Sequence, residues 1–492
     1  MSESKSSYRQ ILKATSLFGG VQFFTILIAV IRTKLITLFI GPMGVGVIGL
    51  LNSTIELIAG FTNFGLQTSA TKAIAESDEN SLKLSKTATV IDKLVWITGF
   101  FAFTFTLVFS YWLSILTFGN SDYTIYFIWI SISLLLKQLT SGKLAILQGL
   151  RKLNNLARAN LYGSLLGFVV TIPMYYYWKI DAIAPSIIIS SLIGYLVAFY
   201  FSSKIKIPKV QLSNQEIITE AKCILHLGIM LSLSGFITLA ASYILQIFIN
   251  RLGGITQVGF YNAGFTILNS YVGIIFTVMT TDYFPRLTAA INDKIKVNKS
   301  VLEQATIAVL IITPIIIVFL VFASLIIEIL YSKEFLVITA MISWGVLGML
   351  FKAVSWSIGF ILIAKGDSKL FTKTALGFNS ISLILNCLGY YFYGLEGLGI
   401  SFVLYYFIHF YGLKIIVKKH YDFYFEPTFY KIYLLCILMC FATFALRYID
   451  NSVLKTILMF FMVVISILFS LYHLDKKMNL KEIMSSKFNT RR

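Results

Sequence analysis

The sequence predicts an all-α polytopic integral membrane protein with about 14 transmembrane helices. Hydrophobic residues make up 57% of the 492 residues, charged residues only 13%, and the mean hydropathy is +0.82. A water-soluble fold cannot hide so much apolar surface, because even its packed helices keep a polar face. The apolar runs are about 20 residues or longer, whereas the strands of a transmembrane barrel would be about 10 residues of alternating pattern. We therefore expect helices.

About 14 apolar runs follow one another along the chain, each near the length that a bilayer requires. We expect the first to be a retained span and not a signal peptide, because no small-residue cleavage site follows a short apolar core. The approximate cores of the runs are 17–40, 47–71, 89–115, 123–147, 160–178, 184–202, 224–250, 259–284, 303–330, 337–363, 372–393, 398–417, 429–447 and 453–473.

The distribution of basic residues predicts the orientation of these spans. The net charge of +19 is carried mainly by short loops between apolar runs, a pattern typical of membrane proteins. With the N-terminus in the cytoplasm, about 30 basic residues fall on the cytoplasmic side and about 5 on the opposite side. Both termini are therefore expected to be cytoplasmic, and no nucleic acid is expected as a partner.

An internal repeat relates the first six spans to the next six. Four pairs of positions match at an offset that drifts slowly from about 213 to about 217 residues. The pairs are Val45-Gly46 with Val258-Gly259, Lys72 with Arg286, Lys137 with Lys352, and 149–153 with 366–370. Because six spans per copy preserve orientation, the repeat is parallel. It predicts a six-helix lobe at 1–210, a second six-helix lobe at 211–419, two additional helices at 420–474 and a basic cytoplasmic tail at 475–492.

Basic side chains inside the spans are the candidate binding groups, because a cation in hydrocarbon costs roughly 2.5–3.5 kcal/mol and needs compensation. Lys137 and Lys352 lie centrally in their spans and are repeat-related, which favours a cationic cavity over internal ion pairing. Lys34 lies about 10 Å from the turn at 41–46, so it either snorkels to the interface or faces a cavity. Arg32 points about 200° away from Lys34 on a helix, which makes it the weaker candidate.

Two carboxylates, Glu56 and Asp282, are candidates for proton or cation coupling, a frequent role of acidic residues inside membranes. They could equally be the counter-ions of Lys34 or Lys72, and the sequence leaves both interpretations open. We expect Lys143, near the end of its span, to snorkel to the interface.

No pattern in the sequence indicates catalysis. There is no nucleotide-binding Gly-x-x-x-x-Gly-Lys-Ser/Thr motif, the four histidines are dispersed, and the four cysteines have no metal-ligand spacing. We therefore expect no catalytic residues, no metal and no cofactor, and we expect that the protein is not an enzyme.

Two stretches in the first 160 residues carry a family resemblance. They are 34–46 (Lys-Leu-Ile-Thr-Leu-Phe-Ile-Gly-Pro-Met-Gly-Val-Gly) and 63–72 (Asn-Phe-Gly-Leu-Gln-Thr-Ser-Ala-Thr-Lys), supported by Gln148-Gly149 with Arg151-Lys152. With the two six-helix lobes, they resemble the Wzx-type O-antigen or lipid-linked oligosaccharide flippases of the multidrug/oligosaccharidyl-lipid/polysaccharide (MOP) exporter superfamily. The last two helices are similar in number to the extra pair of the lipid II flippases, where the pair forms a groove for the polyprenyl tail.

The resemblance implies a bacterial inner-membrane protein of polysaccharide or lipopolysaccharide biosynthesis. Its substrate would be an undecaprenyl-pyrophosphate-linked glycan, and its other partners membrane lipids and the polysaccharide polymerase with its chain-length machinery. In this interpretation Lys34, Lys137, Lys352 and Arg32 bind the anionic headgroup, and the two lobes rock to expose the site to each side in turn.

Two other functions compete with this interpretation. A multidrug or small-molecule antiporter of the same superfamily would need a carboxylate-lined pocket for cations, whereas the deep ionisable residues here are mainly basic. A membrane enzyme of polysaccharide assembly would normally carry catalytic residues on a large external loop, and the predicted external loops are short.

Overall fold

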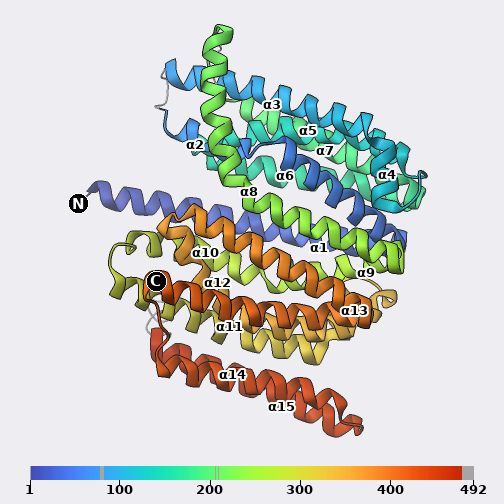
Figure 1. Ribbon diagram of the computed structural model, residues 1–492, viewed down its shortest axis with the longest axis vertical. Coiled ribbons are helices and arrows are strands. Elements are labelled where there is room, and N and C mark those ends of the chain that lie inside the picture. Colours follow the sequence, from blue (N-terminus) through green and yellow to red (C-terminus); the bar gives the residue numbers. More distant parts are fainter. Residues whose placement is uncertain (1, 78–81, 206, 209, 479–492) are drawn as a thin grey trace, which may run out of the picture. The chain divides into compact units, whose positions relative to one another are not determined.

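The computed structural model of the chain describes residues 2–77, 82–205, 207–208 and 210–478. These residues form helices joined by short connections, with no β-strand among them, as the sequence predicts (Figure 1). Residues 479–492, most of the predicted basic tail, lie outside the described residues. Contacts divide the chain into unit 1, which is Met1–Gly259 with Leu330–Ser332, and unit 2, which is Phe260–Ile329 with Lys333–Arg492.

Unit 1 contains all helices of the first predicted repeat and continues into the second. Its elements are α1 (Ser2–Thr62), α2 (Leu66–Ala75), α3 (Leu82–Val108), α4 (Ser110–Phe118), α5 (Thr124–Gly149), α6 (Leu153–Trp178), the 3-10 helix η1 (Lys179–Ala182), α7 (Ile183–Ser203), α8 (Asn214–Gly253) and the start of α9 (Ile255–Thr266). Helix α8 is the first span of the second predicted repeat, yet its contacts place it in unit 1. The lobe boundary at residue 210 stays a prediction from the sequence.

Unit 2 contains the remaining spans. Its elements after the end of α9 are the π-helix η2 (Ile267–Val272), α10 (Ile274–Ala289), α11 (Lys294–Leu330), the 3-10 helix η3 (Lys333–Ile338), α12 (Thr339–Lys365), α13 (Ser368–Tyr421), α14 (Pro427–Ala445), the 3-10 helix η4 (Leu446–Tyr448) and α15 (Ser452–Met478). Helix α12 is the most buried of the apolar helices of this unit, because 72% of its most apolar window is enclosed by other residues.

Eleven helical segments among the described residues are long and apolar enough to cross a bilayer. Three of them contain a break between two spans: α1 breaks at Gly41 (φ 63°), α13 breaks at Gly394 (φ 56°), and η1 separates α6 from α7. Glycine adopts a positive φ without a steric penalty, and Pro42 then starts the next helical stretch of α1. Counting each broken segment as two spans gives 14, so the predicted fold class is confirmed.

The predicted span at 47–71 is wrong toward its C-terminal end. Helix α1 ends at Thr62 and α2 begins at Leu66, because Phe64 (φ 49°) and Gly65 (φ 66°) leave the helical conformation. Gly65 lies against the backbone of Gly228 in α8. A Cβ atom on Gly65 would collide with the Gly228 carbonyl, and a Cβ atom on Gly228 would collide with the Phe64 carbonyl. The apolar pattern runs through this break, so hydropathy alone does not reveal it.

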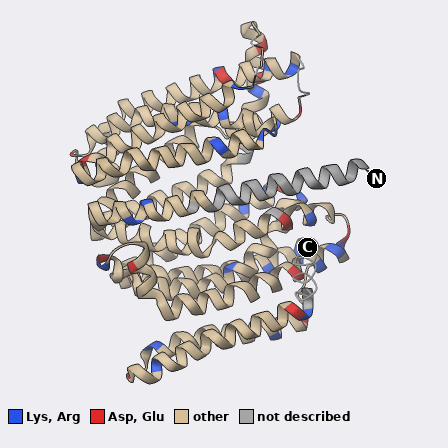
Figure 2. Cartoon of the chain, turned by 180° about the vertical axis from the view of Figure 1, so that it is seen from behind, with Lys and Arg blue, Asp and Glu red and all other residues tan. Residues whose placement is uncertain are grey.

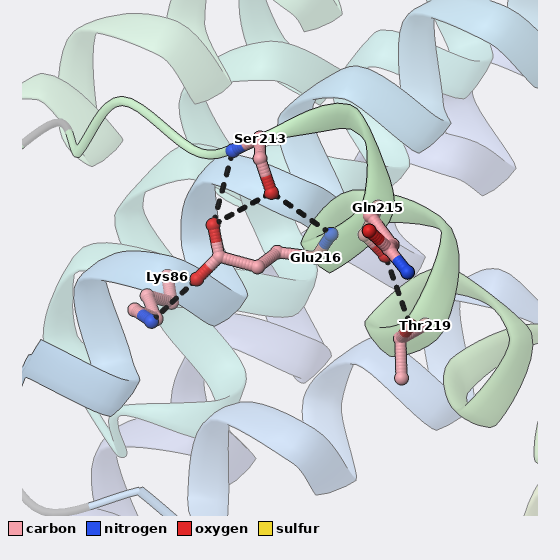
Figure 3. Close-up of polar contacts among 5 residues, drawn as sticks. All are labelled: Lys86, Ser213, Gln215, Glu216 and Thr219. Atoms are coloured by element: carbon pink, nitrogen blue, oxygen red, sulfur yellow. Dashed lines mark hydrogen bonds and ion pairs between the residues drawn. The ribbon is translucent and has the colours of Figure 1, made fainter.

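The beginning of α8 is fixed to unit 1 by a polar cap and an apolar face. The Ser213 hydroxyl accepts a hydrogen bond from the Glu216 N–H at 3.3 Å, and the Glu216 carboxylate accepts one from the Ser213 N–H at 3.0 Å (Figure 3). Lys86 of α3 donates to the same carboxylate at 2.9 Å. These hydrogen bonds lower the pKa of Glu216 to about 2, and the bond from Lys86 has the largest effect. Ala221 and Ile224 are buried against α2, α3 and α5.

The end of α8 is fixed to unit 1 as well. The side-chain amide of Asn250 donates to the carbonyl of Thr117 at 2.9 Å, and the Arg251 guanidinium donates to the carbonyl of Leu116 at 3.1 Å. These acceptors belong to the last turn of α4, where unpaired carbonyls and the helix dipole favour a cation. Helix α8 is therefore held by unit 1 at both of its ends.

The two glycines matched by the predicted repeat pack closely within unit 1. Gly46 of α1 lies against the backbone of Ile255, and Gly259 of α9 lies against the backbone of Pro42. A Cβ atom at either position would collide with a carbonyl oxygen, so neither site has room for a larger residue. The Val-Gly pairs that define the repeat thus have a common packing role.

Candidate functional site

Charged residues lie mostly near the ends of the helices, and few lie along the described parts of the spans (Figure 2). In unit 1, one pair of opposite charges lies on the middle part of two predicted spans. Lys137 of α5 and Glu56 of α1 are both exposed, and the two charges interact electrostatically. Interactions between exposed charges are worth only about 0–1 kcal/mol, so either group can readily take another partner.

A buried polar network positions Lys137. The next residue, Gln138, is buried, and its amide donates to the Asn63 side-chain oxygen at 3.1 Å and to the Thr98 hydroxyl at 2.8 Å. Asn63 begins the break between α1 and α2, so the network joins this break to α3 and α5. Lys137 is thus presented from a fixed part of the helix.

Lys34 and Arg32 are both half-buried in α1. Lys34 donates to the backbone carbonyl of Tyr331, a residue of unit 1. The Nε atom of Arg32 is buried and has no hydrogen-bond partner among the described residues, and the guanidinium interacts electrostatically with the buried Tyr175. Lys34 therefore donates to a protein carbonyl in this conformation, whereas the buried Nε–H of Arg32 is available to donate to a ligand.

Lys352 of α12 is half-buried in unit 2, within a cage of aromatic rings. Its Nζ atom donates to the side-chain oxygen of Asn269 at 2.7 Å. The same atom lies 5.2 Å from the ring centroid of Tyr406 and 5.8 Å from those of Phe276 and Phe402. Ring faces attract a cation, so the three rings interact favourably with the Lys352 ammonium. Asn269 lies in η2, and π-helical turns of this kind are often found at functional sites.

Asp282 is exposed, and its carboxylate lies 3.6 Å from the Arg286 guanidinium one turn along α10. Lys72, which the sequence offered as a possible partner of Asp282 or Glu56, instead pairs with Glu76 of its own helix at 3.7 Å. The surface pair of Asp282 gives no support to a coupling role for this residue.

Lys143 is engaged in an ion pair that the sequence did not predict. Its ammonium lies 2.7 Å from the carboxylate of Asp92 on α3. Because both side chains are only partly exposed, Lys143 is held by a protein carboxylate within unit 1. His409, whose Nδ1 has no hydrogen-bond partner, packs between the rings of Phe378 and Tyr405.

The structure therefore assembles two separate groups from the predicted residues: Lys137 with Glu56 in unit 1, and Lys352 in its cage in unit 2. Sequence reasoning missed the cage residues Asn269, Tyr406 and Phe402. The apolar run 259–284 contains two asparagines, Asn262 and Asn269, and polar amides within a span are a signal that could have found Asn269. The aromatic residues could not have been found, since Phe and Tyr are abundant throughout the spans. The ammonium groups of Lys137 and Lys352 can each donate hydrogen bonds to the oxygens of an anionic ligand.

Residues 35–340 match the family described as polysaccharide biosynthesis protein. The chain belongs to this family. The match begins beside Lys34 and ends in α12, so it spans both units of this polysaccharide biosynthesis protein. No curated protein is significantly similar to the sequence.

Solved structures share the fold of this polysaccharide biosynthesis protein. A lipid II flippase MurJ in an inward closed conformation aligns with a TM-score of 0.70 and 15% identity, over 94% of this chain and 99% of the flippase. An inward-facing multidrug resistance MATE family transporter of the MOP superfamily aligns with a TM-score of 0.68 and 15% identity, over 80% and 95% of the two chains. A MOP superfamily transporter from Pyrococcus furiosus, described as having a binding pocket of reverse polarity, aligns with a TM-score of 0.58, 15% identity and coverage of 82% and 96%.

The solved structures confirm the predicted fold, and the family match confirms the predicted link to polysaccharide biosynthesis. The protein is a multi-pass membrane protein of polysaccharide biosynthesis with the helical fold of MOP superfamily flippases and transporters.

Proposed function

We propose that this protein is a flippase that moves an undecaprenyl-pyrophosphate-linked oligosaccharide, an O-antigen or related repeat unit, from the cytoplasmic to the outer leaflet. The observation that carries the proposal is the position of the Lys352 amino group, which lies inside a membrane span beside Asn269 and three aromatic rings. A basic group at this depth is suited to an anionic headgroup. Membership of the polysaccharide biosynthesis family supports a glycan as the cargo.

In this mechanism the basic residues predicted from the sequence bind the pyrophosphate. Lys137 exchanges the exposed Glu56 carboxylate for a phosphate oxygen, and Lys34, Arg32 and Lys352 contribute further donors. The two units then move so that the headgroup is released on the other side. Transfer of negative charge out of a negative-inside cell is favoured by about 2.3 kcal/mol per charge per 100 mV, so the membrane potential can drive transport without ATP.

The remaining parts of the proposal follow from the predicted orientation. The protein resides in the bacterial inner membrane with both termini in the cytoplasm, and it passes its product to a polysaccharide polymerase and chain-length machinery. Glu56 is the stronger candidate for ion coupling, because its carboxylate interacts electrostatically with Lys137. Asp282 is the weaker one, because its carboxylate is exposed and paired with Arg286.

The test is a double variant, Lys137→Ala with Lys352→Ala, in a strain that lacks the chromosomal copy of this gene. We expect the lipid-linked glycan to accumulate on the cytoplasmic side, with variant protein present in the membrane at the normal level. The control is Lys369→Ala with Lys373→Ala, which removes two exposed lysines from α13 of unit 2 and is expected to export normally. Full export by the Lys137/Lys352 variant would refute the proposed site.

A second candidate function is multidrug or small-molecule antiport, favoured by the likeness to MATE transporters. It predicts that deletion of the gene sensitises cells to cationic drugs and leaves surface polysaccharide intact. The flippase proposal predicts the reverse outcome in the same deletion strain.

A further inference from the structure

A pocket of about 320 Å³ lies in unit 2, where the last two helices meet the body of the unit. It is lined by α11, the start of α12, Glu396 of α13 (two residues after the Gly394 break), the end of α14, η4 and the start of α15. Trp344 on its wall precedes the caged Lys352 by eight residues, about 12 Å along α12. In the predicted orientation this end of the unit lies on the outer side of the membrane.

Two cations and one carboxylate lie in the pocket lining: Arg447, Lys455 and Glu396. Among the described residues, neither Arg447 nor Lys455 forms an ion pair at salt-bridge distance. Lys455 instead donates to the backbone carbonyl of Arg447 at 3.1 Å, and the Glu396 carboxylate accepts a hydrogen bond from the Trp344 indole at 3.0 Å. The lining therefore has an excess of positive charge.

The charged groups are held in place by one continuous set of contacts. Phe444 lies 4.4 Å from Trp344 between ring centroids, and the Arg447 guanidinium lies 5.7 Å from the Phe444 ring. Through Trp344 these contacts reach Glu396, and through the Arg447 carbonyl they reach Lys455. The two cations are thus fixed by α12, α14 and α15 before any ligand arrives, which reduces the entropy lost on binding.

Apolar side chains complete the lining and indicate the type of ligand. Leu320 and Met459 lie in the pocket wall, and Leu454 and Ile457 beside Lys455 on α15 are exposed. Trp and Tyr at such a helix end are typical of the membrane–water interface. A ligand that combines a phosphate group with apolar chains satisfies both the cations and this apolar surface.

We propose that this pocket binds the phosphate group of an anionic phospholipid through Arg447 and Lys455. The lipid ties α14 and α15 to the rest of unit 2 by bridging the two cations. The site is separate from the residues assigned to glycan transport, and it does not depend on that function.

The experiment uses the full-length chain, purified in detergent and stripped of lipid. Binding of phosphatidylglycerol and phosphatidylcholine is titrated by native mass spectrometry. We expect Arg447→Gln with Lys455→Gln to weaken phosphatidylglycerol binding at least about tenfold, because two charge-assisted contacts are lost. The matched control, Lys369→Gln with Lys373→Gln, removes the same charge from exposed positions of unit 2 and is expected to bind like wild type.

A second variant tests the same pocket in the opposite direction. Glu396→Gln removes the carboxylate from the lining and is expected to strengthen phosphatidylglycerol binding, so the proposal stays testable if the double variant does not fold. Equal affinity in wild type and the double variant, no gain in Glu396→Gln, or equal binding of phosphatidylcholine would each overturn the proposal. Competition by glycerol 1-phosphate or inorganic phosphate as effective as that by phosphatidylglycerol would assign the pocket to a soluble phosphate and overturn the lipid assignment.

Discussion

Replacing Lys352 by methionine separates a structural role of this residue from a functional one. Methionine fills nearly the same volume without the charge, so the cage of Phe276, Phe402 and Tyr406 stays packed. The substitution leaves the Asn269 side-chain oxygen without its donor, which costs about 1–3 kcal/mol. The relief from holding a desolvated charge offsets much of this cost. We expect the net change in the free energy of unfolding to stay within about 2 kcal/mol.

The effect on transport should be much larger than the effect on stability. A hydrogen bond from an ammonium to a charged partner is worth about 1.5–3 kcal/mol, which corresponds to a loss of at least about tenfold in binding of the headgroup. The assay is the rate at which lipid-linked glycan appears on the outer leaflet in spheroplasts, normalised to protein in the membrane. Lys373→Met, an exposed lysine of α13, serves as the control.

Two outcomes for Lys352→Met are informative. Loss of transport with normal protein levels shows that the charge itself is used. Transport at the wild-type rate would refute the reasoning, since the cage would then only pack the interior of unit 2. Lys352→Arg adds a further check, because the larger guanidinium keeps the charge but does not fit the Asn269 and ring geometry, and it should restore transport only in part.

Three further predictions concern unit 1. The pKa of Glu216 is lowered from 4.5 to about 2, so the stabilisation from its contact with Lys86 is present above pH 4.5 and is lost as the pH falls toward 2. Amide exchange in the first turn of α8 should therefore become faster over that pH range, and Glu216→Gln should abolish this pH dependence. Gly46→Ala should lower the free energy of unfolding in bicelles by about 1–3 kcal/mol, because the new methyl group meets the Ile255 carbonyl; an unchanged stability would contradict the close packing. Arg251→Gln should cost about 1 kcal/mol in the same measurement, since it removes a cation from the C-terminal end of α4, and the effect should be smaller at high salt.

Hydropathy and charge were sufficient for the fold class because the bilayer constrains the length of each span. The run at 17–40 ends at the Gly41 break, and the pair at 372–393 and 398–417 is separated by Gly394, as the two positive φ angles require. The break at Phe64 and Gly65 was missed because its cause is not local. Gly65 is required by the approach of Gly228, a residue more than 160 positions away, and no pattern within 47–71 records that contact.

The candidate site shows the same limit. The depth of Lys137 and Lys352 could be predicted, because a position within a span is a property of the sequence. Their partners could not, because they lie on other helices: Glu56 faces Lys137 from α1, and Asn269 reaches Lys352 from a π-helical turn. Asp282 was selected for its charge alone, and its nearest cation is Arg286, one turn along its own helix.

The attachment of α8 bears on how the two predicted copies of the repeat depend on each other. In the predicted repeat α8 is the first span of the second copy, but Glu216 and Gly228 hold its beginning and Arg251 its end within unit 1. A cut between the predicted copies would therefore separate α8 from the helices that it packs against. When fragments 1–213 and 214–492 are expressed together, we expect a working protein only if α8 inserts into the membrane and packs against the helices of fragment 1–213. Either fragment alone should be degraded, because the residues that hold both ends of α8 belong to fragment 1–213.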